Sequence, residues 1–177
     1  MQASLPIALI GYRGTGKTTV SRLLAARLDY RWIDADAEIE RRAGKSIGEI
    51  FDELGEPVFR DLEAEVVAEL CQWDGVVLAL GGGAVLRETN RRCLARCWAV
   101  VWLRASVETL AQRIADDPTT AARRPNLTNH GGRTEIEHLL GEREPIYRAC
   151  ATLEVDTEGK DPAEIADEIV AAIQPVG

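Results

Sequence analysis

The chain has 177 residues, of which 46% are hydrophobic and 28% charged, a composition that excludes a disordered or fibrous protein. Acidic side chains outnumber basic ones by 29 to 21, which argues against a general nucleic-acid-binding surface because such a surface needs positive potential. No apolar stretch has the length of a membrane span, and the first residues lack the pattern of a secretory signal. We therefore expect a cytoplasmic protein with a single domain over residues 1–177, away from membranes and nucleic acids.

Short apolar runs alternate with longer segments of helical period along the chain, a pattern typical of βαβ units that build a parallel sheet. Near-continuous apolar strands are buried on both sides, so helices are expected on both faces of the sheet. Three pairs of residues mark helix starts, namely Ser46 with Glu49, Thr134 with Glu137, and Asp161 with Pro162. The predicted strands are residues 7–10, 31–33, 76–80, 99–103 and 153–155.

The segment from Asp116 to Arg133 has no helical period and combines prolines, glycines and asparagines with several arginines. A loop of this length inside a compact domain is usually functional or disordered. The sequence therefore predicts a mobile loop at residues 116–133.

A glycine-rich motif follows the first predicted strand directly. Residues 11–18 read GYRGTGKT, which fits G-x-x-x-x-G-K-[ST], and an apolar helical run comes next. In this motif backbone N–H groups surround phosphate oxygens, and the helix N-terminus adds its positive dipole. Lys17 should reach the β- and γ-phosphates, and Thr18 should offer its hydroxyl to magnesium. A chance glycine turn is the alternative, but the flanking strand and helix favour nucleotide binding.

Two acidic residues, Asp34 and Asp36, leave the second predicted strand. Ligands of doubly wound folds collect at the carboxyl ends of parallel strands, so these carboxylates should lie beside the phosphate loop. One could serve a metal ion and the other a substrate hydroxyl. A helix N-cap is the alternative role for Asp34, since an apolar-periodic run follows it.

Further along, Gly81-Gly82-Gly83 follows the third predicted strand, and such a run suggests a close backbone approach to a ligand as well as a possible turn. Arg60 and Arg143 carry planar guanidiniums that match a carboxylate in two hydrogen bonds. By themselves, both arginines are better explained by a solvated helix face with salt bridges to Glu63 or Glu144.

The ordered set of motifs resembles shikimate kinase over nearly the whole chain. It comprises the phosphate loop, Asp34-Ala-Asp36, Phe59-Arg60-x-x-Glu63, the triple glycine, Arg124-Pro125 and Arg143-Glu-Pro-Ile-Tyr147. The resemblance implies an α/β P-loop kinase fold with a five-stranded parallel sheet in the order 2-3-1-4-5. It also implies a substrate-binding helical region at about residues 34–62 and a mobile lid at about residues 116–133. The expected reaction is ATP-dependent phosphorylation of shikimate by a monomer.

The same resemblance assigns site residues. The implied catalytic residues are Asp36, Lys17 and Arg124. The implied nucleotide-binding residues are Gly14, Thr15, Gly16, Lys17, Thr18, Thr19, Arg113, Arg124, Lys160 and Pro162, with Arg113 and Pro162 on either side of adenine. The implied substrate-binding residues are Asp36, Arg60, Gly81, Gly82, Gly83 and Arg143. The implied magnesium ligands are Thr18 and Asp34. The polar stretch 125–132 departs from the family pattern and leaves the lid geometry open.

Two other functions fit part of this pattern. One is a kinase of the same fold that acts on another sugar acid, such as gluconate. The other is a nucleotide-dependent switch that transfers no phosphoryl group. A panel of acceptors distinguishes the first from a shikimate kinase, and acceptor-stimulated turnover excludes the second.

Overall fold

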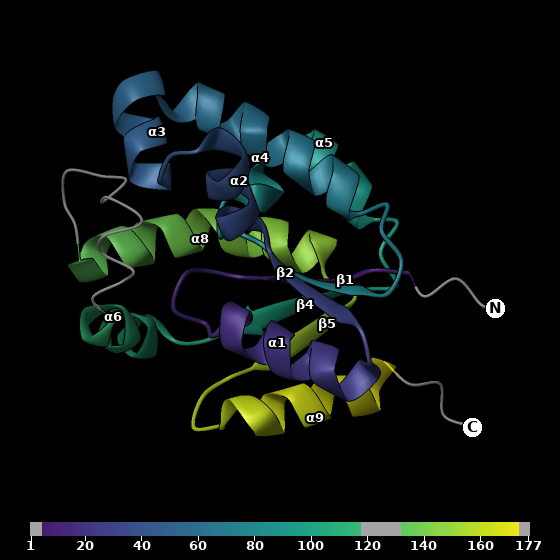
Figure 1. The fold of residues 1–177 in the computed structure, drawn as a ribbon. Coiled ribbons are helices and arrows are strands. Elements are labelled where there is room, and N and C mark those ends of the chain that lie inside the picture. Colours follow the sequence, from purple (N-terminus) through teal and green to yellow (C-terminus); the bar gives the residue numbers. More distant parts are fainter. Residues whose placement is uncertain (1–4, 118–131, 174–177) are drawn as a thin grey trace.

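The computed structural model describes residues 5–117 and 132–173. Within them, one sheet of parallel strands has the order β2-β3-β1-β4-β5 (Figure 1). The strands are β1 (Ile7–Ile10), β2 (Arg31–Asp34), β3 (Val76–Ala79), β4 (Ala99–Arg104) and β5 (Leu153–Asp156). The strand order implied by the resemblance is therefore confirmed.

Helices connect the strands and cover both faces of the sheet. They are α1 (Lys17–Leu28), α2 (Ala35–Ala43), α3 (Ile47–Leu54), α4 (Glu56–Leu70), the 3₁₀ turn η1 (Ala84–Leu86), α5 (Glu88–Leu94), α6 (Val107–Asp116), α8 (Gly132–Cys150) and α9 (Pro162–Ile173). In the part of the chain that the structure describes, none of these helices has both the length and the apolar character needed to cross a membrane.

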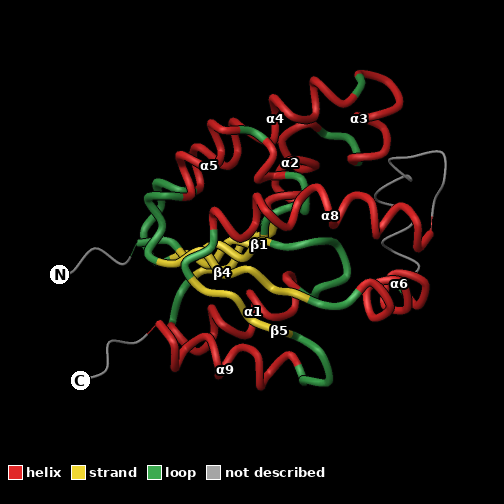
Figure 2. The backbone as a smooth tube through the Cα atoms, turned by 180° about the vertical axis from the view of Figure 1, so that it is seen from behind, coloured by secondary structure: helices red, strands yellow, loops and turns green. Residues whose placement is uncertain are grey.

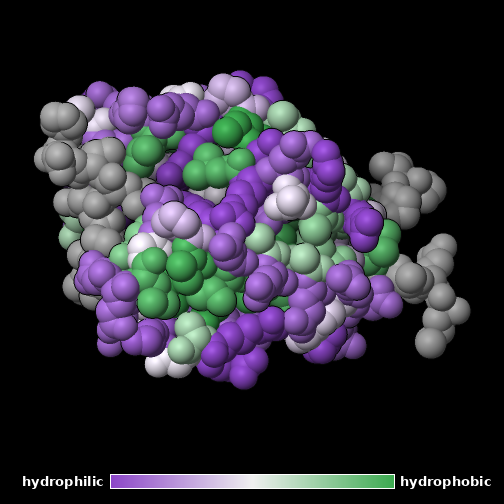
Figure 3. Space-filling view, turned by 90° about the horizontal axis from the view of Figure 1, so that it is seen from above, coloured by the Kyte–Doolittle hydropathy of each residue, from purple (hydrophilic) through white to green (hydrophobic). Residues whose placement is uncertain are grey.

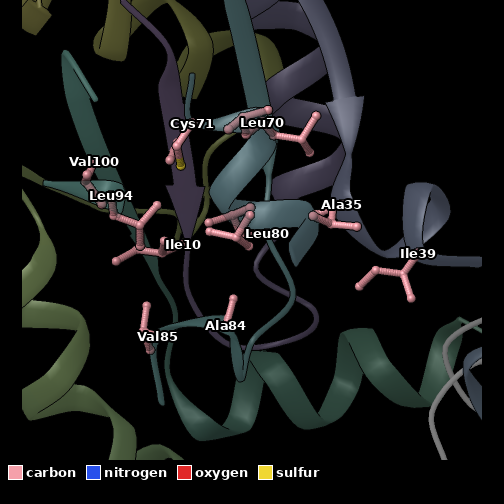
Figure 4. Close-up of a cluster of buried hydrophobic side chains, with 14 of the residues drawn as sticks. Ile10, Ala35, Ile39, Leu70, Cys71, Leu80, Ala84, Val85, Leu94 and Val100 are labelled. Carbon is pink, nitrogen blue, oxygen red and sulfur yellow. The ribbon is translucent and has the colours of Figure 1, made fainter. Parts of the chain in front are cut away.

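The strands lie between two layers of helices, as the view from behind also shows (Figure 2). Helices α1 and α9 pack on one face, and α4, α5 and α8 lie on the other. Side chains of β1 alternate between the layers: Ile7 and Leu9 join the cluster with α1 and α9, whereas Ala8 and Ile10 join the opposite cluster. Figure 4 shows part of that opposite cluster around Ile10 and Leu80.

The predicted strands are confirmed, with ends that differ by one residue. β2 extends to Asp34, β4 to Arg104 and β5 to Asp156, while β3 ends at Ala79. The N–H of Leu80 still donates to the carbonyl of Leu9 at 3.1 Å, so the backbone pairing continues one residue beyond β3. The loops that carry the site thus begin where the parallel ladder stops.

Two of the three predicted helix starts are confirmed. Ser46 and Glu49 form a reciprocal capping box at α3, and Pro162 begins α9 with the Asp161 carboxylate accepting from the N–H of Ala163 at 2.9 Å. The predicted start at Thr134 is wrong, because α8 begins at Gly132. The helix therefore includes two more residues before Thr134. One of them, Arg133, pairs with Glu137 one turn further along and with Glu108 of α6.

The predicted loop at residues 116–133 is too long at both ends. Asp116 belongs to α6, and Gly132 and Arg133 belong to α8. Residues 118–131, which include Arg124, lie outside the described residues.

Candidate active site

A pocket of about 310 Å³ opens at the carboxyl ends of the central strands, where doubly wound folds bind ligands. It is lined by residues of the phosphate loop, of the β2–α2 junction, of the loop after β3 and of α6. These residues are Arg13, Gly14, Gly16, Lys17, Thr18, Thr19, Asp34, Asp36, Ala79, Leu80, Gly81, Gly82, Arg113 and Asp117. The pocket thus contains ten of the residues that the resemblance assigned.

The phosphate loop takes its shape from glycines with positive φ. Gly14 has φ 84° and Gly16 has φ 88°, a region that side chains rarely enter. A Cβ at Gly11 would lie 2.4 Å from the carbonyl oxygen of Leu103, so the loop packs tightly against the end of β4. Gly16 is also the N-cap of α1 and supplies no side chain to the first N–H groups. These amides are therefore suited to bind an anion.

Lys17 lies at the base of this loop and is 9% exposed. Its ammonium donates to the carbonyl oxygens of Gly11 and Tyr12, at 2.8 Å each. Thr15 does not line the pocket, but its hydroxyl donates to the same Tyr12 carbonyl at 2.8 Å. Lys17 and Thr15 thus hold the loop from inside while Lys17 faces the pocket.

Asp34 takes the N-cap role that the sequence offered as the alternative, and its second oxygen lies beside the phosphate loop. One oxygen, Oδ1, accepts from the N–H groups of Asp36 at 3.0 Å and Ala37 at 3.2 Å, which caps α2. The other, Oδ2, accepts from the hydroxyl of Thr18 at 2.9 Å. The cap fixes the carboxylate so that its second oxygen stays beside the phosphate loop. Asp36, in the first turn of α2, lines the same pocket.

The Thr18 and Asp34 oxygens fit magnesium, a hard cation that is usually bound through one or two carboxylates together with substrate phosphates. Among the described residues, no group of three or more His, Cys, Asp or Glu side chains could hold a metal without such help. The site is therefore suited to a metal that arrives with a nucleotide.

Arg60 lies on α4 and is only 9% exposed, so it does not belong to a solvated helix face. Its Nη1 donates to Glu63 at 2.8 Å, and its Nη2 donates to Glu56 at 3.1 Å. A Cβ at Gly83 would lie 2.5 Å from Nη1, so the guanidinium packs directly on the glycine turn. Neither Arg60 nor Gly83 lines the pocket itself. Arg60 therefore stands behind the turn, held by a buried carboxylate.

Arg143 lies on α8 and is also buried, at 7% exposure. Its Nη1 is 3.6 Å from the position that a Cβ of Gly82 would take, and its Cζ is 5.8 Å from the ring centre of Tyr12. One turn further, the Tyr147 hydroxyl donates to the carbonyl oxygen of Gly82 at 2.6 Å. Helix α8 thus holds both the second arginine and the main chain of the glycine turn.

Arg113 on α6 lines the pocket beside the phosphate loop. Its guanidinium donates to the carbonyl of Gly14 at 3.3 Å and to the carbonyl of Thr157 at 3.2 Å. Thr157 begins the connection from β5 to Pro162, so these contacts bring Arg113 toward the region predicted to bind adenine. Lys160 pairs with Glu168 at 2.6 Å and does not line the pocket.

Three residues of the site were not assigned a role from the sequence. Glu63 orients Arg60 from three positions along α4, and Tyr147 holds Gly82 from four positions beyond Arg143. Helical spacing places each residue on the same face as its arginine. Once the arginine is assigned to the site, this spacing in the sequence points to its neighbour as well. Arg13 occupies a variable position of the phosphate-loop motif, and the motif gives no signal for it.

The fold and this pocket define a phosphate-loop kinase: a cradle of main-chain amides, with carboxylates and arginines on the opposite side, suits phosphoryl transfer to a small acceptor. The profile of the family described as "SKI: Shikimate kinase" matches residues 13–174. A shikimate kinase of Rhodopirellula baltica is 44% identical over 93% of this chain and 88% of its own length. One from Pseudomonas putida is 44% identical over 95% of both chains.

Solved structures agree with these sequence comparisons. Shikimate kinase from Acinetobacter baumannii in complex with shikimate superposes with a TM-score of 0.89 at 37% identity, covering 96% of this chain and 92% of that one. A gluconokinase from Sinorhizobium meliloti, with a TM-score of 0.63 and 19% identity over 98% of this chain and 93% of its own, shows the fold alone. The chain belongs to the shikimate kinase family. The expected family, fold and kinase activity toward shikimate are confirmed.

Proposed function

We propose that the chain binds magnesium and ATP in the phosphate loop and holds shikimate between Asp36, the glycine turn 81–83 and the two arginines Arg60 and Arg143. The observation that carries this assignment is a shared pocket: Asp36 and Gly82 line the same cavity as Lys17 and Thr18. An acceptor hydroxyl beside Asp36 is therefore close to the phosphates that Lys17 would hold.

On the nucleotide side, the amides of Gly14, Gly16 and the first turn of α1 surround the phosphate oxygens, and Lys17 follows the γ-phosphate during transfer. Thr18 and Asp34 would hold the magnesium ion, which would offset the negative charge of the phosphates during transfer. Their hydroxyl and carboxylate supply oxygen donors at this edge. Thr15 and Thr19 complete this side through the shape and polarity of the loop.

On the acceptor side, Arg60 and Arg143 bind the shikimate carboxylate, since a planar guanidinium can donate two parallel hydrogen bonds to it. Their burial lowers the cost of ordering them, because Glu63 and Tyr12 already restrict both side chains. Asp36 accepts a hydrogen bond from the attacking hydroxyl and can take its proton. The N–H groups of the glycine turn approach the substrate ring.

The remaining assignments follow the same division. Arg113 and Pro162 contact adenine, with Lys160 nearby, and Arg124 reaches the phosphates during transfer. We further propose that the enzyme is a monomer of the cytoplasm. Light scattering during size-exclusion chromatography checks the monomer, and a subunit mass of 19.4 kDa is the expected result.

A coupled assay of ADP release tests the function. Turnover should require both shikimate and magnesium, and a panel containing gluconate and other sugar acids should give no comparable rate. Rapid turnover of gluconate without shikimate activity would favour the other small-acid kinase. ADP release that no acceptor stimulates would favour a nucleotide switch.

A further inference from the structure

A third arginine, Arg13, lies at the pocket without an assigned role. It belongs to the phosphate loop and lines the pocket, unlike Arg60 and Arg143, which stand behind the glycine turn. Its side chain is 16% exposed, and Nη2 lies 3.4 Å from Oε1 of Glu135, whose side chain is fully buried. The phosphate-loop motif accepts any residue at this position, so binding of phosphate by the loop does not by itself require an arginine here.

Several contacts place Arg13 on the acceptor side of the pocket. A Cβ added to Gly82 would lie 3.5 Å from the main-chain nitrogen of Arg13 and 3.6 Å from Nη1 of Arg143. Glu135, which holds the guanidinium of Arg13, is on α8, the helix that carries Arg143. Lys17, by contrast, reaches under the loop to the carbonyls of residues 11 and 12. The side chain of Arg13 therefore leaves the phosphate cradle and reaches toward the helix of the second substrate arginine.

The electrostatics of Tyr12 agree with this placement. Burial raises the pKa of its phenol, and the guanidiniums of Arg13 and Arg143 both act in the opposite direction, so both cations lie near the same ring. On the face of the molecule in Figure 3, green hydrophobic groups lie between larger purple hydrophilic areas. An anionic acceptor that enters the pocket would thus meet Arg13 beside Tyr12 as well as Arg143.

Pairing with Glu135 does not prevent Arg13 from binding a ligand. Arg60, behind the glycine turn, shows the same kind of pairing, since its guanidinium is held at one edge by the buried Glu63. A guanidinium has several N–H donors, so the bonds of Arg13 to Glu135 and to the phenol of Tyr12 still leave donors for a ligand. The buried carboxylate reduces the freedom of the side chain before the ligand arrives.

We propose that Arg13 is a third arginine of the acceptor site, which donates to the carboxylate of shikimate from the phosphate-loop side, and that Glu135 is its positioning residue. A carboxylate has enough lone pairs to accept from three guanidiniums. This assignment rests on the proposed function for the identity of the acceptor. The competing role is a purely structural tie between the phosphate loop and α8.

The test compares Arg13→Met with the double variant Arg13→Met/Glu135→Gln, which removes both charges of the pair and avoids leaving Glu135 buried beside a neutral side chain. Arg92→Met is the control, because Arg92 is 75% exposed on α5 and pairs only with Glu88 in the described structure. The measurements are the melting temperature, KM for shikimate, KM for ATP, and calorimetric titration of shikimate without nucleotide.

Both Arg13 variants should raise KM and Kd for shikimate by roughly tenfold, the loss of a charge-assisted hydrogen bond, with KM for ATP within about twofold of wild type. With shikimate methyl ester as acceptor, the difference between wild type and variant should largely disappear, because the carboxylate charge is gone. The Arg92 control should leave both KM values unchanged.

Three results would overturn the proposal. A rise in KM for ATP as large as that for shikimate would place Arg13 on the phosphates. A double variant with wild-type KM and Kd for shikimate would leave only the structural tie. An equal loss with shikimate and its methyl ester would exclude the carboxylate. The comparison requires a wild type that phosphorylates shikimate. A wild type without this activity would contradict the proposed function itself, and with it the assignment of Arg13 to the shikimate carboxylate.

Discussion

The two sides of the pocket are built in different ways. The proposed nucleotide side comes almost entirely from one continuous segment, residues 11–19, shaped by glycines with positive φ. The proposed acceptor side collects Asp36 from α2, Arg60 from α4, the glycine turn after β3 and Arg143 from α8. The buried Glu63 orients the Arg60 side chain, and the buried Tyr147 holds the main chain of Gly82. A local motif is thus enough for phosphate binding, whereas acceptor recognition requires the assembled fold.

This difference predicts a separation of kinetic effects. Changes on the nucleotide side should lower kcat or affect ATP, and changes on the acceptor side should raise KM for shikimate.

The largest effect is expected from Lys17→Ala. Removal of the ammonium takes away the side-chain cation at the γ-phosphate, and kcat should fall by about a thousandfold or more. Calorimetric titration of shikimate should give a much smaller change in affinity, since the Lys17 ammonium donates to the phosphate-loop carbonyls of Gly11 and Tyr12. Unchanged turnover would show that the γ-phosphate lies elsewhere.

The next effect is expected from Arg60→Lys. The charge beside Glu63 is kept, but the planar fork is lost, so KM for shikimate should rise by roughly thirtyfold, about 2 kcal/mol, with little change in KM for ATP. Steady-state kinetics with each substrate varied in turn measures both constants. Equal effects on both substrates would contradict the division between the two sides.

A smaller effect is expected from Gly83→Ala. The added Cβ would lie 2.5 Å from Nη1 of Arg60, whose guanidinium is held by Glu56 and Glu63 and cannot move away freely. KM for shikimate should therefore increase by about tenfold.

Gly141→Ala is the matched control for this variant. Gly141 lies on α8 two residues before Arg143, and a Cβ there would have no neighbour within 4 Å. The helix should gain up to about 1 kcal/mol of stability, and the kinetics should not change. A wild-type KM for Gly83→Ala would show that the position of Arg60 tolerates displacement.

The smallest effect is expected from Glu38→Gln on the outer face of α2, two residues from Asp36. Hydrogen bonds from Arg41 and Arg42 lower the pKa of Glu38 from 4.5 to about 2. A depressed pKa stabilises the fold above pH 4.5, and this contribution is lost as the pH falls toward about 2.

The variant should lower the melting temperature at neutral pH by about 1–2 °C, as expected for ion pairs near the surface of a helix. Thermal melts from pH 7 downward should show this difference shrinking through the same pH range, with both KM values unchanged. A kinetic effect as large as that of Arg60→Lys would mean that the whole of α2 belongs to the acceptor side.

The sequence by itself determined the parallel sheet and the phosphate loop, because apolar strands and a contiguous glycine motif are local patterns with a fixed physical meaning. It also left two roles open for Asp34; the structure confirms the helix cap through one oxygen and places the other beside Thr18, where a metal role stays a prediction. It misplaced the start of α8, since the turn before Thr134 is supported by Arg133 and its partner on α6, which no local pattern shows.

Only the tertiary structure decided whether Arg60 and Arg143 are exposed to water or buried. Helical periodicity leaves both choices open, and the answer depends on what packs against each helix: the glycine turn lies against both guanidiniums and buries them. The pairing of Arg13 with Glu135, 122 residues away along the chain, was likewise beyond any local pattern. Contacts of this kind are set by how the helices pack on the sheet, and the sequence specifies them only through the complete fold.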